Sequence, residues 1–517
     1  MLLQFRNYIC TNQNLVKSIN NFYSIIFLFI SAALITSCAG TKPPHAFTKL
    51  GPQQMKQELQ IVHQTLKNNH PSYSWFTPAE KIDSNFQAIY NSINDSLNVQ
   101  QFRMILSKAV EPIKCGHTAI RSLEPLPSYI KQKHDYIFPL YLKVWNNDSA
   151  VILANAFTKD SGLSRGVVIY SINRLTINNY LDSIFQFIST DAYNQTHKYQ
   201  IVSNNFPAWF KNIYGSKSDT AFNITGRYTN GNYFDTTILG YDIVYQDSLL
   251  KAKRKADTLS PKPKLPTLTR EQKRLQYRSL KIDTTLNMAV LDIKTFSKSG
   301  TKKFFKKSFR ALNKQGIKNL VVELRSNGGG RLDNSTNLIR YLKKDNYRVA
   351  DSIYTRGFDF PYPKYVTQRF WLNLEYLFLG KKDANGNKHL KHYEKTQHKP
   401  FRKNHFDGNI YIVTGGSTFS ASTLFTNALQ GQDNVLVVGE ETGGGNYGNT
   451  AIHIPDIVLP HSKIKVRIPL FRMVLNKDKE LVPRGIFPNV EIPPTAEFIK
   501  NNIDPKMHYI EKRISKS

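Results

Sequence analysis

The sequence predicts an α/β fold, and two observations in the second half of the chain favour it. Apolar runs typical of buried strands alternate there with helix-like stretches. Two of the runs also end in glycines just before a helix-like stretch begins. In chain order the stretches are 287–296 (strand), 301–316 (helix), 318–324 (strand), 331–344 (helix), 408–414 (strand), 420–430 (helix) and 434–439 (strand). Because such alternation places helices over a sheet, it predicts a mixed or parallel α/β core.

The N-terminus is typical of a lipoprotein signal peptide, residues 1–37. Arg6 and Lys17 precede an apolar run that is short for a membrane span and ends in small residues before Cys38. This ending resembles a bacterial lipobox, which implies cleavage before Cys38 and diacylation of its thiol. The alternative is an uncleaved N-terminal anchor. In either case we expect an exported protein held to a membrane of the bacterial cell envelope, in the periplasm or at the cell surface.

The cysteine count and the net charge limit which kinds of protein the chain can be. Beyond Cys10 in the leader and Cys38, only Cys115 remains, so no intrachain disulfide is expected. The formal net charge is +32, and the leader carries two of these charges, which leaves +30 for the mature chain. The basic residues are spread along the chain without an aromatic-basic motif. This favours a solvated basic surface near anionic lipid and argues against nucleic-acid binding.

The remaining chain divides by pattern into five predicted parts. A helical region follows a short polar tether, and β-branched runs then predict a β-rich module. In that module, 161–184 resembles a PDZ-like segment, with a divergent β-rich domain as the alternative. A charged, proline-punctuated stretch predicts a linker. The predicted boundaries are 38–52 (tether), 53–135 (helical domain), 136–245 (β-rich module), 246–284 (linker) and 285–517 (α/β domain).

The segment GGSTFSASTLF, 415–425, places hydroxyl groups between a strand and a helix. Ser420 lies close to the predicted helix N-terminus, where unpaired N–H groups and the helix dipole favour negative charge. A nucleophile there has the N–H of Ala421 behind it as an oxyanion donor. The alternative is helix capping by Ser417, Thr418 or Ser420. We expect Ser417 in the turn and Ser422 inside the helix.

A second glycine-rich loop, 328–330, follows the strand VVELRSN. Such a loop exposes backbone N–H groups without side chains in the way, as an oxyanion hole requires. An ordinary strand-to-helix turn and a phosphate cradle are the alternatives. The phosphate-loop lysine pattern is absent, which disfavours nucleotide binding.

Three blocks, NLVVELRSNGGG, YIVTGGSTFSASTLFTNALQ and VLVVGEETGGG, occur in one order across 287–494. In that order they resemble the tail-specific, or C-terminal-processing, serine peptidase family, which also includes tricorn-like members. The resemblance implies a crotonase-like β-β-α spiral for the catalytic domain, Ser420 as nucleophile, and an oxyanion hole from the N–H groups of Ala421 and Gly329. It implies no metal and no cofactor.

The chain departs from the family in one respect. The bacterial tail-specific branch has a lysine after the GE-x-T block as general base, and here Gly445 takes its place. A serine hydroxyl then needs another base, most often histidine. The segment IKCGHTAI resembles the histidine segment of tricorn-like relatives, which makes His117 the candidate base. The alternative is a buried, structural histidine.

An acid that orients His117 completes the expected site. Tricorn-like relatives take a glutamate near a terminal G-x-x-P-[DN] block, here 485–489, and the nearest acid upstream is Glu480. Glu440 and Glu441 are other candidates, although we expect them to brace the end of a strand. We expect Arg325 and Asn327 to fix the glycine loop.

The sequence therefore predicts an exported, lipid-anchored serine endopeptidase that acts on extended polypeptides. The alternative is a catalytically inactive family member that binds a peptide or hydrophobic ligand. The sequence contains no pattern that indicates the oligomeric state, the natural substrate or the cleavage preference.

Overall fold

The chain divides into two compact units, Met1–Pro44 and His45–Ser517, and the structure describes residues of the second. In this computed structural model the described residues are 48–121, 134–145, 148–155, 162–215, 220–245, 268–475 and 481–516. The predicted signal peptide, Cys38, most of the predicted linker and Glu480 lie outside them. Among the described helices, none combines the length and apolar character needed to cross a membrane.

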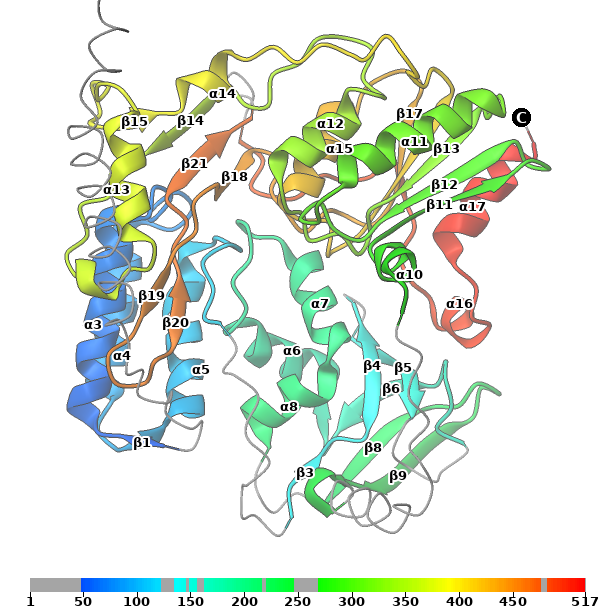
Figure 1. The fold of residues 1–517 in the computed structure, drawn as a ribbon. Helices are drawn as coiled ribbons and strands as arrows, with labels where there is room; N and C mark the ends of the chain where they lie inside the picture. The colour runs from blue at the N-terminus through cyan, green and yellow to red at the C-terminus, as the bar shows by residue number, and fades with distance from the viewer. Residues whose placement is uncertain are drawn as a thin grey trace, which may run out of the picture. The chain divides into compact units, whose positions relative to one another are not determined.

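A six-stranded sheet forms the centre of the second half of the chain (Figure 1). Its strands run parallel from β12 onward, and β11 pairs antiparallel with β12 at one edge. In spatial order the strands are β11 (Arg278–Asp283), β12 (Met288–Ile293), β13 (Asn319–Glu323), β16 (Asn409–Thr414), β17 (Val435–Gly439) and β22 (Val490–Glu491). The predicted mixed α/β fold is confirmed. The crotonase-like spiral stays a prediction. Strand β11 lies within the stretch predicted as linker, 246–284.

Both faces of this sheet are covered, which explains why its strands read as continuous apolar runs. In β13, Leu320 and Val322 belong to one apolar cluster, whereas Val321 between them belongs to another. The first cluster packs under α11 (Thr301–Lys314), α12 (Leu332–Ile339) and α15 (Ala421–Leu429), and the second under α17 (Pro505–Ile514).

The β-rich region is an antiparallel sheet with three helices against it. Its strands, in spatial order, are β4 (Leu140–Val144), β5 (Ala150–Asn155), β6 (Val168–Ile172), β8 (Ala221–Arg227) and β9 (Tyr233–Leu239), with β7 (Leu175–Thr176) paired to β6. The helices are α6 (Ile177–Phe185), α7 (Gln195–Asn204) and α8 (Phe206–Tyr214). A β-rich region is thus confirmed, and its PDZ-like character stays a prediction.

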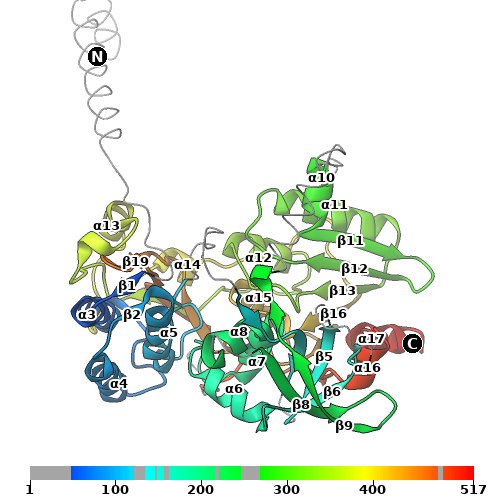
Figure 2. The ribbon, with the colours of Figure 1, turned by 90° about the horizontal axis from the view of Figure 1, so that it is seen from below.

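The predicted helical N-terminal region contains three helices, but their apolar core is shared with later segments of the chain. Helices α3 (Pro52–Asn69), α4 (Ala79–Ser92) and α5 (Val99–Val110) pack in one cluster with residues from 349–379 and 457–473. Both views show α13 and β19 beside α3 (Figures 1 and 2). Three amphipathic helices bury only a stripe each, so they require this cover.

The covering elements come from far along the sequence. A four-stranded antiparallel sheet runs in the order β15 (Lys388–His389), β14 (Ser352–Thr355), β21 (Phe471–Val474) and β18 (Gly448–Ala451). Beside it lie the hairpin of β19 (Asp456–Val458) and β20 (Lys465–Arg467) and the helix α13 (Arg369–Leu377). Through this arrangement the chain brings the segment after α5 close to the central sheet.

Candidate active site

Ser420 occupies a strained backbone position between β16 and α15. Its φ is 54° and its ψ is −122°, a combination that residues with a Cβ rarely adopt. Its side chain is half-buried and accepts no capping hydrogen bond, although Ser420 is the residue before the first helical position. Helix capping therefore does not explain why a serine occupies position 420. Such strain persists only where the surroundings enforce it, and it concentrates at functional sites.

Hydrogen bonds to neighbouring segments fix the turn. The Thr418 hydroxyl donates to Leu324 O (2.9 Å) and accepts from the Gly415 N–H (3.1 Å). The Phe419 N–H donates to Asn327 O (3.1 Å). From the β-rich region, His197 Nδ1 donates to the carbonyl of Gly416 (2.7 Å). Ser420 is thus held by the glycine loop on one side and by α7 on the other.

The predicted oxyanion donors lie next to Ser420. A Cβ built on Gly329, whose φ is +97°, would lie 2.8 Å from Ser420 Cβ and 2.9 Å from the nitrogen of Ala421. Only glycine fits this contact. Among the described residues, none accepts the N–H of Ala421, which points out of the first turn of α15. That N–H is free to receive a developing negative charge.

Gly329 itself shows a feature that sequence reasoning missed. Its N–H already donates to Asn327 Oδ1 (2.9 Å), while Asn327 Nδ2 donates to Ile293 O (2.9 Å). Within the described part of the chain, the N–H groups of Gly328 and Gly330 have no such acceptor. Asn327 fixes the loop as expected, but it does so through the group that was predicted as the second oxyanion donor.

His117 comes from the N-terminal region and contacts the turn that carries Ser420. It is buried, and its ring centroid lies 4.8 Å from that of Phe419, the residue before Ser420. His197 stacks on Phe419 at 4.9 Å. The buried Nδ1 of His117 has no hydrogen-bond partner among the described residues. Burial, reinforced by Arg467 and His197, lowers the pKa of His117 to about 3, so its imidazole is neutral at pH 7.

A carboxylate that sequence analysis did not single out lies beside His117. The side chains of Cys115, His117 and Asp191 each bring one donor atom within 4.8 Å of the other two. Asp191 Oδ1 accepts the N–H of Gly116 (2.8 Å), and Oδ2 accepts the N–H of Gly445 (3.3 Å). Burial raises the pKa of Asp191 to about 6.

The position of Gly445 thus has a structural use. Where the tail-specific branch has a lysine, this chain offers a backbone N–H to Asp191. The sequence held no signal for Asp191, since it lies in an irregular segment after α6 without a motif around it. Its role depends on segments that are far apart in the sequence.

The two glutamates of the GEET segment, Glu440 and Glu441, hold neighbouring segments together through hydrogen bonds and ion pairs. Glu441 accepts hydrogen bonds from Asn194, Thr196, Arg484 and the N–H of Gly485. Glu440 pairs with the buried Lys506 (2.7 Å), which also donates to Thr414 O at the end of β16 (2.9 Å). Among the described residues, neither carboxylate forms a hydrogen bond or an ion pair with His117.

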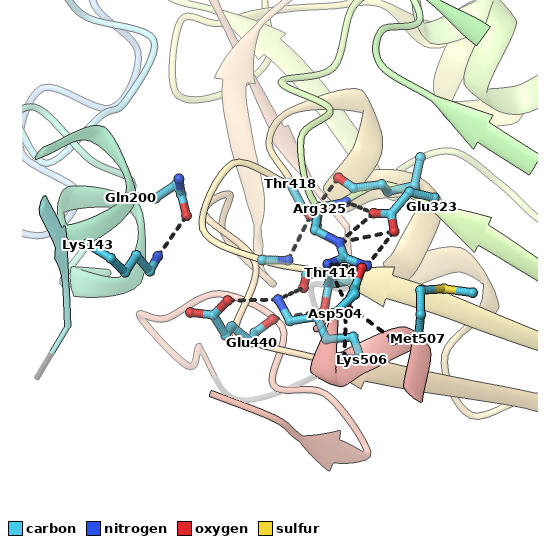
Figure 3. A network of polar contacts seen from close by, with 12 residues as sticks. Lys143, Gln200, Glu323, Arg325, Thr414, Thr418, Glu440, Asp504, Lys506 and Met507 are labelled. Carbon is cyan, nitrogen blue, oxygen red and sulfur yellow. Dashed lines mark hydrogen bonds and ion pairs between the residues drawn. The ribbon is translucent and has the colours of Figure 1, made fainter. Parts of the chain in front are cut away.

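Figure 3 shows how this end of the sheet is braced. Arg325 extends from the glycine-loop strand to Glu323 (2.7 Å) and Asp504 (2.8 Å). Asp504 is the N-cap residue of α17, and Lys506 in the first turn of this helix reaches Glu440. These ion pairs and the hydrogen bond from Lys506 to Thr414 O therefore join the start of α17 to the ends of β13, β16 and β17.

Chemically, the arrangement combines a serine with free backbone donors and a neutral imidazole. These are the groups that acyl transfer through a serine requires. Of the predicted site residues, Ser420, Ala421 and Gly329 meet at one place, and His117 contacts the same turn. Glu480 lies outside the described residues, so its role stays a prediction.

Comparison with known proteins agrees with this reading. Residues 287–492 match the model of peptidase family S41. The structure resembles mature CPAF, with a TM-score of 0.59 and 11% identity over 90% of this chain and 96% of that one. It also resembles mature CPAF complexed with lactacystin, with a TM-score of 0.58 and 12% identity over 90% of this chain and 98% of that one. At such identity these likenesses show the fold.

No curated protein is similar enough in sequence to match this chain. The segment that matches the family model contains β12 through β22, the glycine loop and Ser420. The expected resemblance is therefore confirmed at the level of the family, whereas the place among tricorn-like or Ser/Lys branches stays a prediction. Residues 287–492 form a peptidase family S41 domain, and the chain is a serine-type peptidase.

Proposed function

We propose that this chain is an exported, lipid-anchored serine endopeptidase in which Ser420 is the nucleophile and His117 the general base. The observation that carries the proposal is the strained Ser420 backbone, held against Gly329 with the Ala421 N–H unpaired beside it. The contact of His117 with Phe419 supports the choice of base.

In the proposed mechanism, Ser420 Oγ attacks the scissile carbonyl carbon while its proton passes to His117. The N–H of Ala421 and one N–H of the 328–330 loop donate to the resulting oxyanion. Collapse of this intermediate expels the amine, which takes the proton from His117. Water then hydrolyses the acyl-enzyme by the same route, and Ser420 is regenerated.

We further propose that Asp191 stabilises the imidazolium form of His117. A buried histidine with a lowered pKa is a weak base unless a nearby anion compensates its positive charge. Asp191 is a carboxylate within 4.8 Å of a His117 nitrogen. Replacing it with asparagine should lower kcat while KM changes little, as expected for a group that acts only when the proton moves.

A fluorophosphonate probe and intact-mass analysis test the nucleophile. We expect single-site labelling that is lost in Ser420→Ala and in His117→Ala. Ser417→Ala is the matched control, because Ser417 lies in the same turn and should label normally. A folded wild-type protein that stays unlabelled and cleaves no denatured polypeptide would favour the alternative, a peptide-binding member of the family.

The lipid anchor is a separate proposal that rests on the segment before Cys38. It predicts that an alkyne-labelled fatty acid is incorporated into the protein in a bacterial host. Cys38→Ala should abolish this incorporation, whereas Cys10→Ala should leave it unchanged because Cys10 would be removed with the leader. Equal labelling of wild type and Cys38→Ala would contradict the anchor.

A further inference from the structure

We propose that Cys115, His117 and Asp191 form a Zn²⁺ site through which the metal inhibits the peptidase. The inhibitory part rests on the proposed role of His117, whereas the binding part does not. The three side chains are 3%, 7% and 2% exposed, and one donor atom from each lies within 4.8 Å of the other two.

The backbone already holds these three residues together. Cys115 and His117 are separated by one residue, Gly116, whose N–H donates to Asp191 at 2.8 Å. On a tetrahedral zinc with bonds of roughly 2.0–2.3 Å, two donor atoms lie about 3.5 Å apart. The cluster therefore needs to contract by on the order of 1 Å, within the reach of side-chain rotation.

The donor set suits zinc. A thiolate, an imidazole and a carboxylate are ligands that Zn²⁺ takes, and the sulfur disfavours Mg²⁺ and Ca²⁺. The buried Nδ1 of His117 lacks a partner among the described residues. Because the thiolate and carboxylate carry two negative charges, they would neutralise the bound cation in a buried position.

Without a cation, burial favours the protonated forms of two of these groups. It raises the pKa of Cys115 to about 11 and that of Asp191 to about 6. Zinc would replace these protons. The nearby Arg467, whose charge lowers the pKa of His117, opposes the metal. We therefore expect reversible binding rather than a permanent structural zinc.

Inhibition follows whichever ring nitrogen binds. If zinc occupies the nitrogen that would take the proton of Ser420 in the proposed mechanism, it blocks proton transfer directly. If it occupies the other nitrogen, the first nitrogen keeps its proton in the neutral ring and accepts no second one. In both cases His117 stops acting as a base.

Direct binding is measured by calorimetry with Zn²⁺ alone on the full chain carrying Ser420→Ala, which needs no catalysis. We expect one zinc per chain. In this background Cys115→Ser and Asp191→Asn should each weaken binding at least tenfold. His392→Ala, which removes an exposed histidine from the basic 388–405 segment, is the control and should change nothing.

Circular dichroism would reveal whether Cys115→Ser or Asp191→Asn disturbs folding. If one of them does, the other variant still tests the site. Absent saturable binding, or binding that both folded variants leave unchanged, would overturn the site. This result is independent of the peptidase proposal, since the protein used cannot turn over.

Inhibition is then measured on active protein. Zinc should suppress polypeptide cleavage, and a chelator should restore it. Cys115→Ser should retain basal cleavage and require at least tenfold more zinc for half inhibition. Binding without inhibition, or equal inhibition of wild type and Cys115→Ser, would overturn the inhibitory role.

Discussion

At the scale of single residues, the candidate catalytic serine, Ser420, has a strained backbone conformation. Its φ of 54° and ψ of −122° suit glycine rather than serine. The threonine hydroxyl groups around it donate hydrogen bonds to backbone carbonyls. Thr418 donates to Leu324 O, and Thr423 donates to Thr418 O (3.0 Å). Neighbouring polar side chains thus stabilise a backbone geometry that a serine at position 420 disfavours.

Ser420→Gly should stabilise the protein while abolishing activity. The strain is worth about 1–3 kcal/mol, and glycine costs roughly 0.5–1 kcal/mol of backbone entropy, which leaves a gain of about 1 kcal/mol. Ser420→Ala keeps the Cβ and should show no such gain. Urea unfolding of both variants measures the difference. Ser417→Gly, at a position with ordinary φ, should lose stability.

Alanine substitutions at Gly328 and Gly329 test the close contact of the glycine loop with Ser420, because these adjacent glycines differ in their surroundings. Gly329→Ala would place a Cβ 2.8 Å from Ser420 Cβ at a positive φ, so we expect a loss of about 2 kcal/mol or more and no probe labelling. A Cβ on Gly328 meets no heavy atom within 4 Å. Gly328→Ala should therefore label normally, and equal effects of the two substitutions would contradict the contact.

At the scale of elements, α17 braces the strand that delivers Ser420. Lys506 is 5% exposed and joins this helix to Glu440 and to Thr414 O, the last residue of β16. The pair lies between the helix and the ends of β16 and β17. Loss of this pair would release the end of β16, after which the turn with Ser420 begins.

Lys506→Met should lower the free energy of unfolding by about 3 kcal/mol, because it leaves the carboxylate of Glu440 without its main partner. We expect kcat to fall more than KM rises, since the substitution displaces the turn with Ser420, the proposed nucleophile, and removes no substrate contact. Lys512→Met on the exposed side of α17 is the control and should stay within about 0.5 kcal/mol of wild type. Similar losses in both variants would contradict the brace.

At the scale of the whole molecule, the N-terminal helices share their core with the C-terminal half. Leu59 of α3 and Phe102 of α5 belong to the same apolar cluster as Val466 and Phe471. The loop after α5 carries His117 to Phe419 from this shared core. The helices therefore position the candidate base as well as stabilise the fold.

A chain that starts at residue 134 should fail to fold, although it contains the whole segment that matches the family model. Without residues 48–121, fully buried side chains such as Val466 and Phe471 become exposed. We expect aggregation in size-exclusion chromatography and loss of the near-ultraviolet circular dichroism signal. A chain that starts at residue 45, where the second compact unit begins, should remain folded and monodisperse. A soluble, folded shorter chain would contradict the shared core.

The sequence by itself determined the local features of this protein. Strand β16, the glycine-rich turn, Ser420 and α15 follow one another within a single short segment, so their order and spacing are visible in the chain. The same holds for β13 and the 328–330 loop. Apolar periodicity and glycine placement act over a few residues, which is why the α/β core and both glycine loops could be predicted.

Only the tertiary structure decided which distant groups meet. It brought Asp191 between Gly116 and Gly445, and it joined the Gly329 N–H to Asn327. It also merged the N-terminal helices with strands more than three hundred residues away along the chain. No local pattern encodes such contacts, because they arise from burying several amphipathic surfaces against one another. For the same reason, the surroundings of His117 follow from packing rather than from its motif.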